Sequence, residues 1–187
     1  MTVKEAALKN RSYRRFHGDK KISLATLKDL CDIGRCTPSG ANKQPIRFKL
    51  VCDADENNKA YTALKWAGYY KDWDGPIESE RPTGYIFLVA PSDVNAPWDE
   101  GIIAQTILLA AVERGLGGCM LANIDRERLA RDFNIPEKMM VKLVIALGYP
   151  KEEVVIDEIR DGDSIVYYRD ENQVQHVPKI SLDDRIL

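Results

Sequence analysis

The chain has 187 residues, of which 44% are hydrophobic and 30% charged, a composition typical of one globular domain and not of a disordered or fibrous chain. Its net charge is −2 with both signs interspersed, so no basic face is evident and we expect no nucleic-acid partner. The N-terminus is polar and no run of about 18 apolar residues occurs, so we expect a cytoplasmic protein without membrane contact.

The first predicted elements are two surface helices. Residues 3–9 have amphipathic spacing, and Ser23 is placed to cap a second helix that runs to Gly34 with apolar residues at intervals of three and four. Two strands follow. Residues 47–52 alternate in polarity, and residues 84–90 are rich in β-forming side chains between a glycine and a proline.

Between these strands the sequence predicts a polar helix over residues 55–70 and then a long irregular excursion over residues 69–81. The excursion combines aromatic and acidic residues with prolines, which is typical of irregular structure and suits a lid. Tyr70 and Trp73 within it either form an aromatic wall for a flat electron acceptor or pack the excursion onto the body.

The second half of the chain begins with the most apolar helix. From Asp99 the sequence is apolar around most of its circumference, which predicts a buried helix that ends at Gly115. We then expect a helix capped by Asp125 and an apolar strand over residues 141–150. This order implies one mixed α/β domain.

The C-terminal region predicts an extension. S-I-V-Y-Y-R and Q-V-Q-H-V-P flank D-E-N as in a β-hairpin, and S-L-D-D-R-I-L predicts a short capped helix or arm. Such an extension cannot bury its own apolar face, so we expect it to pack on the main body or on a second subunit.

The stretch N-R-S-Y-R-R-F is the first candidate binding segment. Arg11 and Arg14 carry planar guanidinium forks that match phosphate oxygens, and the Ser12 hydroxyl adds a donor. The cluster could hold one phosphate. A solvated, purely structural charge run is the alternative.

The loop P-S-G-A-N-K-Q-P is the second. Ser39, Asn42 and Gln44 offer donors and acceptors, and Gly40 allows the backbone to approach a flat ligand closely. A simple polar turn between a helix and a strand is the alternative.

The glycine-rich stretch G-L-G-G-C-M-L-A-N-I is the third. Its glycines permit backbone amides to point outward, as in anion-binding nests, but their spacing is not G-x-G-x-x-G and does not support a dinucleotide-binding Rossmann domain. No P-loop, nucleophile elbow or zinc motif occurs, and with only two histidines we expect no metal site. The four cysteines form no C-x-x-C pair, which fits reduced, mostly buried thiols.

In their order and combination these stretches closely resemble the nitroreductase family of flavoproteins. The resemblance rests on R-S-x-R, P-S-x-x-N-x-Q-P, the buried helix ending in G-L-G-G-C, and V-I-A-L-G-Y-P, and covers nearly the whole chain. It implies an α+β fold with a central, mainly antiparallel sheet surrounded by helices, in an intertwined homodimer. Residues 1–163 would form the FMN-binding domain, and residues 164–187 a hairpin and arm of that domain that packs on the partner subunit.

The resemblance also implies which residues bind the flavin. Arg11 would lie near the phosphate, Arg14 near the ribityl chain or the pyrimidine edge, and Lys179 would be a late phosphate ligand. Asn10 stands where relatives often carry a second basic residue, so part of the phosphate charge must come from elsewhere. The full implied set is Arg11, Ser12, Arg14, Pro38, Ser39, Gly40, Asn42, Gln44, Met120, Leu121, Ala122, Asn123 and Lys179.

For two parts of this set, the resemblance also implies a position relative to the flavin. The loop from Pro38 to Gln44 would run along the flavin held by the partner subunit. Residues 120–123 would lie beside the isoalloxazine, with Ala122 and Asn123 in place of the acidic residue and glycine of some relatives. The sequence does not identify the hydrogen-bond donor to flavin N5.

The implied activity is that of an FMN-dependent NAD(P)H oxidoreductase. It would reduce nitroaromatics, quinones or similar small acceptors by ping-pong hydride transfer through flavin N5, with the chemistry carried by FMN and no catalytic side chain. The alternatives are another flavin chemistry on the same fold, such as reductive dehalogenation or flavin reduction, a non-catalytic FMN-binding protein, and an α/β interaction domain without flavin. The acceptor and the choice between NADH and NADPH are not readable from the sequence.

Overall fold

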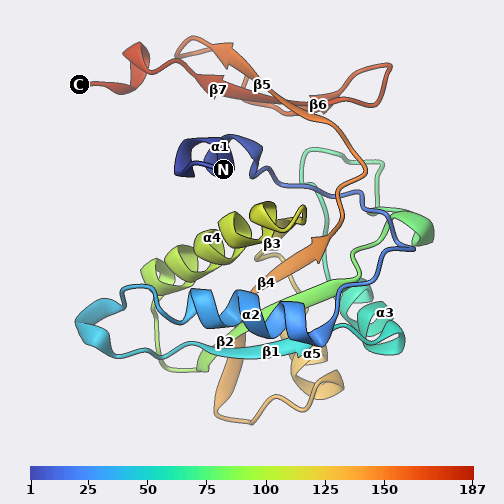
Figure 1. Cartoon of the computed structure of the whole chain (residues 1–187), viewed down its shortest axis with the longest axis vertical. Helices are drawn as coiled ribbons and strands as arrows, with labels where there is room; N and C mark the ends of the chain where they lie inside the picture. The colour runs from blue at the N-terminus through green and yellow to red at the C-terminus, as the bar shows by residue number, and fades with distance from the viewer.

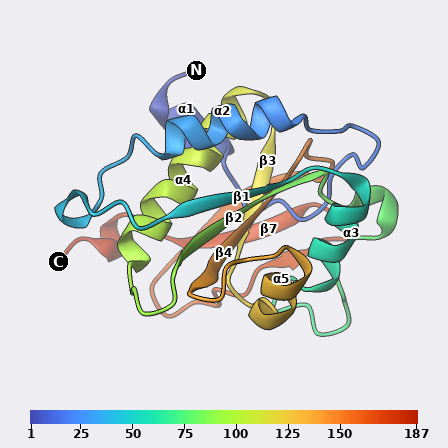
Figure 2. The same ribbon diagram turned by 90° about the horizontal axis from the view of Figure 1, so that it is seen from below.

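A computed structural model describes residues 1–187 and contains a central four-stranded sheet between two layers of helices (Figures 1 and 2). The strand order is β1-β2-β4-β3, and every neighbouring pair is antiparallel. The strands are β1 (Arg47–Val51), β2 (Gly84–Pro91), β3 (Gly117–Leu121) and β4 (Met139–Gly148). The predicted α+β fold with a mainly antiparallel sheet is therefore confirmed, whereas the order of elements alone had implied only a mixed α/β domain.

Both faces of the sheet are buried, which explains the continuous apolar sequence of β2. Ile86 and Leu88 point to one face, where they pack beneath α2 (Leu24–Gly34) and α4 (Pro97–Glu113). The alternate residues Tyr85, Phe87 and Val89 point to the opposite face, which α3 (Ala54–Thr62) and α5 (Arg126–Asp132) cover. Since full burial of such a side chain contributes about 1.5–3 kcal/mol, each face holds its own helical layer.

The helix starts that the sequence predicted are confirmed. In α1 (Val3–Lys9), Thr2 and Glu5 form a reciprocal capping box. The Ser23 hydroxyl accepts a hydrogen bond from the Thr26 amide (3.1 Å) at the start of α2, and the Asp125 carboxylate accepts one from the Arg128 amide (3.0 Å) at the start of α5. Each cap joins a side chain to a backbone amide three residues further on, so the capping residue can be recognised in the sequence.

The helix predicted over residues 55–70 is wrong in its C-terminal half, because α3 ends at Thr62. Leu64 instead forms an isolated bridge with Ile124, and the Lys65 amide donates to the Asn123 carbonyl (3.1 Å). Trp66 follows, only 7% exposed, in the core beneath the sheet. Burial of Leu64 and Trp66 outside the helix outweighs the helical preference of the segment. The excursion that follows is irregular, as predicted, apart from one 3-10 turn at Glu78–Glu80.

The glycine-rich segment is a strand and not an anion-binding nest. Gly115 has φ +71 and ends α4 in the left-handed region, as the sequence predicted. Gly117 and Gly118 lie within β3, where close packing excludes a side chain: a Cβ on Gly117 would lie 2.5 Å from Tyr13 and 2.7 Å from Pro150. The nest interpretation is therefore wrong, and these glycines serve close packing at the edge of the sheet.

The C-terminal extension forms a second, three-stranded sheet in the order β5-β7-β6, which lies across α1 in Figure 1. Its strands are β5 (Val154–Ile159), β6 (Tyr168–Arg169) and β7 (Gln175–Ile180). The hairpin is present, but its first strand has only two residues. The other edge of β7 pairs with β5, in parallel. The boundary proposed at residue 163 thus separates two paired strands. The arm forms one 3-10 turn, Asp183–Arg185, and no helix of the structure has the length and apolarity to cross a membrane.

Candidate functional site

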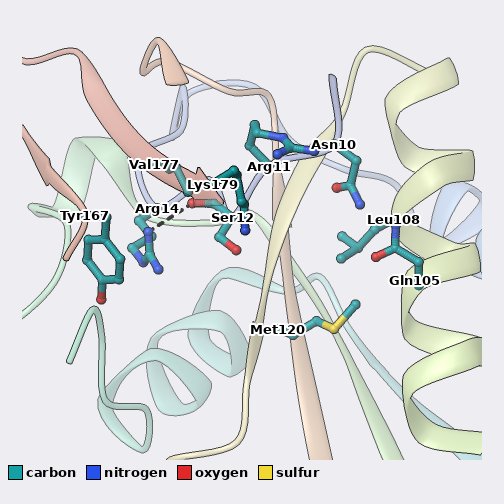
Figure 3. A pocket seen from close by; sticks show the side chains of 10 residues that line it. All are labelled: Asn10, Arg11, Ser12, Arg14, Gln105, Leu108, Met120, Tyr167, Val177 and Lys179. Carbon is teal, nitrogen blue, oxygen red and sulfur yellow. Dashed lines mark hydrogen bonds between the residues drawn. The ribbon is translucent and has the colours of Figure 1, made fainter. Parts of the chain in front are cut away.

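A cavity of about 430 Å³ lies between the edge strand β3, helix α4, the segment after α1 and the C-terminal sheet (Figure 3). The bridge between Ser12 and Gly118 brings the N-terminal segment to this place, because it lays that segment along the edge of β3. The Tyr13 amide donates to the Gly118 carbonyl (3.0 Å) and fixes that register. The cavity is lined by Asn10, Arg11, Ser12, Arg14, Gln105, Leu108, Met120, Tyr167, Val177 and Lys179.

One side of this cavity is cationic. Arg11, Arg14 and Lys179 line it, and no carboxylate does (Figure 3). The Arg11 Nη2 donates to the Ala7 carbonyl (2.5 Å) and the Arg14 Nη1 to the Ser12 carbonyl (3.2 Å), while the Nε atoms of both arginines are buried without a partner. Three cations that line one cavity with no carboxylate among them favour an anionic ligand, because charge-assisted hydrogen bonds to such a ligand are strong.

The other side is apolar. Leu108 of α4 and Met120 of β3 face the cavity, and Met120 shares its face of β3 with Gly118 since the two are two residues apart. Cys119 points to the opposite face and is 3% exposed, and burial raises the pKa of its thiol although the Arg14 charge opposes the shift. The Cys119 thiol is therefore not an available nucleophile at neutral pH. A cationic end beside an apolar floor suits a flat molecule with an anionic tail.

The structure brings together five of the thirteen residues implied as cofactor ligands, namely Arg11, Ser12, Arg14, Met120 and Lys179. Leu121 belongs to the core beneath the opposite face of the sheet. Ala122 and Asn123 are exposed just beyond β3 and do not line the cavity.

The loop from Pro38 to Gln44 lies elsewhere, beside the start of α4, and contributes no residue to the cavity. Ala41, Asn42 and Gln44 have φ values of +50, +53 and +47, which cost energy in residues other than glycine. The loop holds this shape because the Ser39 hydroxyl donates to the Asp99 carboxylate (2.5 Å), as does the Gly40 amide (3.1 Å). Asp99 is only 6% exposed.

We expect Asp99→Asn to destabilise the protein by about 1–2 kcal/mol, since an amide cannot accept both hydrogen bonds and a favourable charge in the first turn of α4 is lost. Denaturant unfolding measures the loss, and hydrogen exchange over residues 38–44 should rise with it. Glu100→Gln is the matched control, because Glu100 carries the same charge in the same turn without a side-chain hydrogen bond. Equal effects of the two substitutions would contradict the role given to Asp99.

Tyr70 and Trp73 pack the excursion onto the C-terminal sheet. Their rings meet edge to face (5.9 Å between centroids), and the Tyr70 hydroxyl donates to Oε1 of the fully buried Gln175 (2.7 Å). Both residues also line an open hollow of about 600 Å³ together with Tyr69. The packing role is thus present, and the role as a wall for an acceptor stays a prediction.

Residues without an obvious sequence signal complete the cavity. Asn10 is 9% exposed and its Oδ1 has no partner. Tyr167 lies with its ring 4.8 Å from the Arg14 guanidinium carbon, a cation–π contact. Gln105 and Leu108 are one turn apart on α4, a spacing that places them on one side of the helix but does not indicate a ligand.

Comparison with known proteins agrees with this fold. The model of the nitroreductase family matches residues 7–83 and 90–149. A "Putative NADH dehydrogenase/NAD(P)H nitroreductase" of Methanothermobacter thermautotrophicus is 30% identical over 173 residues, 88% of this chain and 86% of the relative. Iodotyrosine deiodinase of Thermotoga neapolitana is 26% identical over 168 residues, 79% of this chain and 88% of that protein. The FMN-dependent nitroreductase of Clostridium difficile R20291 has a TM-score of 0.64 at 24% identity, covering 79% and 87% of the two chains.

The antiparallel sheet between helical layers is the fold that this chain shares with the solved structure from Clostridium difficile. The cavity at its edge strand combines three cations with an apolar floor. The chain belongs to the nitroreductase family, a family of oxidoreductases. The resemblance that the sequence motifs indicated is confirmed.

Proposed function

We propose that the protein is an FMN-dependent NAD(P)H oxidoreductase whose flavin binds in the cavity beside β3. The observation that carries the proposal is the group formed by Arg11, Arg14 and Lys179, with no carboxylate among the lining residues. This chemistry fits the phosphate of FMN, and the floor of Leu108 and Met120 fits its ring.

Each residue then has a distinct role. Arg11 and Lys179 hold the phosphate, and the Ser12 hydroxyl adds a donor. Arg14 places positive charge near the ribityl chain or the pyrimidine edge, where it offsets negative charge gained on reduction. Met120 supports the ring, and residues 121–123 follow it along the same edge of the sheet. Asn10 contributes an amide where a second cation is common, so Lys179 supplies the missing charge from the other end of the chain.

The chemistry that FMN supplies when bound is two-electron transfer through its N5 position, in ping-pong order from NAD(P)H to nitroaromatics, quinones or similar acceptors. The protein binds and orients the reactants and excludes water from the cavity. Tyr70 and Trp73 are proposed to face the acceptor from the excursion.

We further propose a homodimer in which Pro38, Ser39, Gly40, Asn42 and Gln44 contact the flavin of the second copy. Two observations support it. The loop is held in a costly conformation although it contributes nothing to the cavity of its own chain. The C-terminal sheet and arm also leave Ile156, Leu182 and Ile186 at least 41% exposed, which is apolar surface that a partner would cover.

Three measurements test the proposal. Protein incubated with FMN and desalted should keep flavin absorbance at close to one FMN per chain, and light scattering should give the mass of a dimer. Anaerobic NADH or NADPH should then bleach the flavin band. Protein that neither retains FMN nor responds to it would overturn the proposal, and a monomer with bound flavin would overturn the role of the loop.

Reductive dehalogenation is the second candidate, favoured by the similarity to iodotyrosine deiodinase. A panel of nitroaromatic, quinone and halophenol acceptors, each offered to the anaerobically reduced protein, separates the two activities. A protein that binds FMN but is not reduced by either nicotinamide would instead be a flavin-binding protein without turnover.

A further inference from the structure

Glu152 is a buried carboxylate next to the candidate site, and neither the sequence motifs nor the proposed mechanism uses it. It follows the end of β4, and its side chain is only 1% exposed. An ionised carboxylate at such a position is costly unless several donors satisfy it. Glu152 accepts three hydrogen bonds, two from backbone amides and one from a guanidinium.

The three donors belong to two different parts of the protein. The backbone amides are those of Arg14 and Arg15 (3.2 Å for Arg15), and both donate to Oε1. They lie in the segment that carries Arg14 into the cationic cavity. The third donor is Nη2 of Arg169 in β6, which lies 3.0 Å from Oε2.

Arg169 in turn holds the excursion. Its guanidinium carbon lies 4.7 Å from the centroid of the Trp73 ring and 5.1 Å from that of Tyr70. Its side chain is 10% exposed, so the two cation–π contacts are largely desolvated and correspondingly strong. The two oxygens of one carboxylate therefore connect the backbone of the cationic cavity to the aromatic residues of the excursion.

We infer that Glu152 is a positioning residue that couples occupancy of the cationic cavity to the ordering of Tyr70 and Trp73; the inference rests on the proposed function, because FMN is the occupant. A ligand held by Arg14 in the cavity restrains the backbone of residues 14 and 15. The amides of that backbone hold Oε1 of Glu152 through hydrogen bonds. The Oε2 atom in turn holds the Arg169 guanidinium against the rings of Tyr70 and Trp73. Filling the cofactor side then makes the acceptor side more ordered.

The two oxygens can be tested separately. In Glu152→Gln the remaining oxygen can still accept from the amides of Arg14 and Arg15, but the new NH₂ group faces Nη2 of Arg169, donor against donor. Glu152→Gln thus breaks the branch to the excursion and keeps the branch to the cavity. Glu152→Ala breaks both.

The experiment measures FMN affinity by quenching of flavin fluorescence, and hydrogen exchange with and without FMN. In the wild type, FMN should slow exchange over residues 69–74 as well as over β3. In Glu152→Gln, FMN affinity should stay within about twofold and protection of β3 should persist. Protection of residues 69–74 should fall, and any remainder passes through Tyr167, which contacts both Arg14 and Tyr70. In Glu152→Ala, FMN affinity should also fall about tenfold.

Two further variants complete the design. Glu153→Gln is the matched control, because Glu153 is adjacent, exposed and makes no side-chain hydrogen bond; it should behave as the wild type. Arg169→Gln should reproduce Glu152→Gln, and the double variant should lose no more protection than either single one, since both act on one contact. Arg169→Gln also keeps the test available if Glu152→Gln does not fold.

The outcomes separate this inference from the proposed function. A wild type that does not bind FMN overturns the proposed function and the inference with it. A wild type that binds FMN without slower exchange over residues 69–74 overturns the inference alone. The same holds if Glu152→Gln and Arg169→Gln keep that protection. Loss of protection at residues 69–74 with unchanged protection of β3 is not the result of general destabilisation, and it supports the coupling.

Discussion

Gly118→Ala should destabilise the protein by about 2 kcal/mol or more, the largest effect that we expect from adding a single methyl group. An added Cβ would overlap the carbonyl oxygen of Ala146 and would lie 2.7 Å from Cδ2 of Leu108. The Ala146 carbonyl cannot move easily, because Ala146 is paired in the ladder between β3 and β4. Overpacking at this position must therefore shift β3 itself.

Denaturant unfolding measures this effect, with Gly101→Ala as the control. Gly101 lies within α4 with nothing inside 4 Å of its added Cβ, so alanine there should stabilise the protein by about 0.5–1 kcal/mol through helix propensity. Because the Gly118 carbonyl accepts from the Tyr13 amide, Gly118→Ala should also speed hydrogen exchange at Tyr13. Equal stability of the two variants would contradict the close packing of β3 against α4.

Arg14→Ala should weaken FMN binding about 10- to 100-fold, the value of one charge-assisted hydrogen bond or ion pair in a partly buried site. The Arg14 side chain faces the cavity, its Nε has no protein partner, and its guanidinium packs against Tyr167. The substitution removes the charge and the stacking contact together. It leaves the Arg14 backbone amide, which still donates its hydrogen bond to Glu152. Bound flavin should also be harder to reduce.

Titration with FMN measures the affinity, and anaerobic titration with NADH or NADPH follows the reduction of the flavin. Arg131→Ala removes an arginine that is 72% exposed on α5 and pairs only with Asp132, so it controls for net charge. We expect it to leave both measurements unchanged. Full flavin content and unchanged reduction in Arg14→Ala would remove Arg14 from the proposed site.

Local interactions explain which elements were predictable. The helices that begin at Ser23 and Asp125 were predicted because each cap joins side chain and backbone three residues apart. The polar helix over residues 55–70 was predicted too long, because nothing local announces that Leu64 pairs with Ile124. The nest predicted at Gly117 and Gly118 was wrong for the same reason. Glycines occur both in loops and in tightly packed strands, and only the nearby positions of Tyr13, Pro150 and Ala146 show which of the two is present.

The candidate site divides in the same way. Arg11, Ser12 and Arg14 form a cluster that the sequence shows directly, and the order of the motifs was enough to identify the family. That Lys179, Tyr167 and Met120 join this cluster depends on the second sheet and on β3. Glu152 is one of two adjacent glutamates in a charged stretch, K-E-E, and its neighbour is exposed.

The sequence by itself determined the family, through it the α+β fold, and the basic segment at the N-terminus. Each motif is a short run of residues, and the order of the motifs along the chain can be read directly. Only the tertiary structure decided which cations share a cavity, which loop stands apart from it and which carboxylate is buried. Burial and charge pairing depend on distances in space between residues far apart in sequence, and the free energy of a buried charge is set by all its neighbours together.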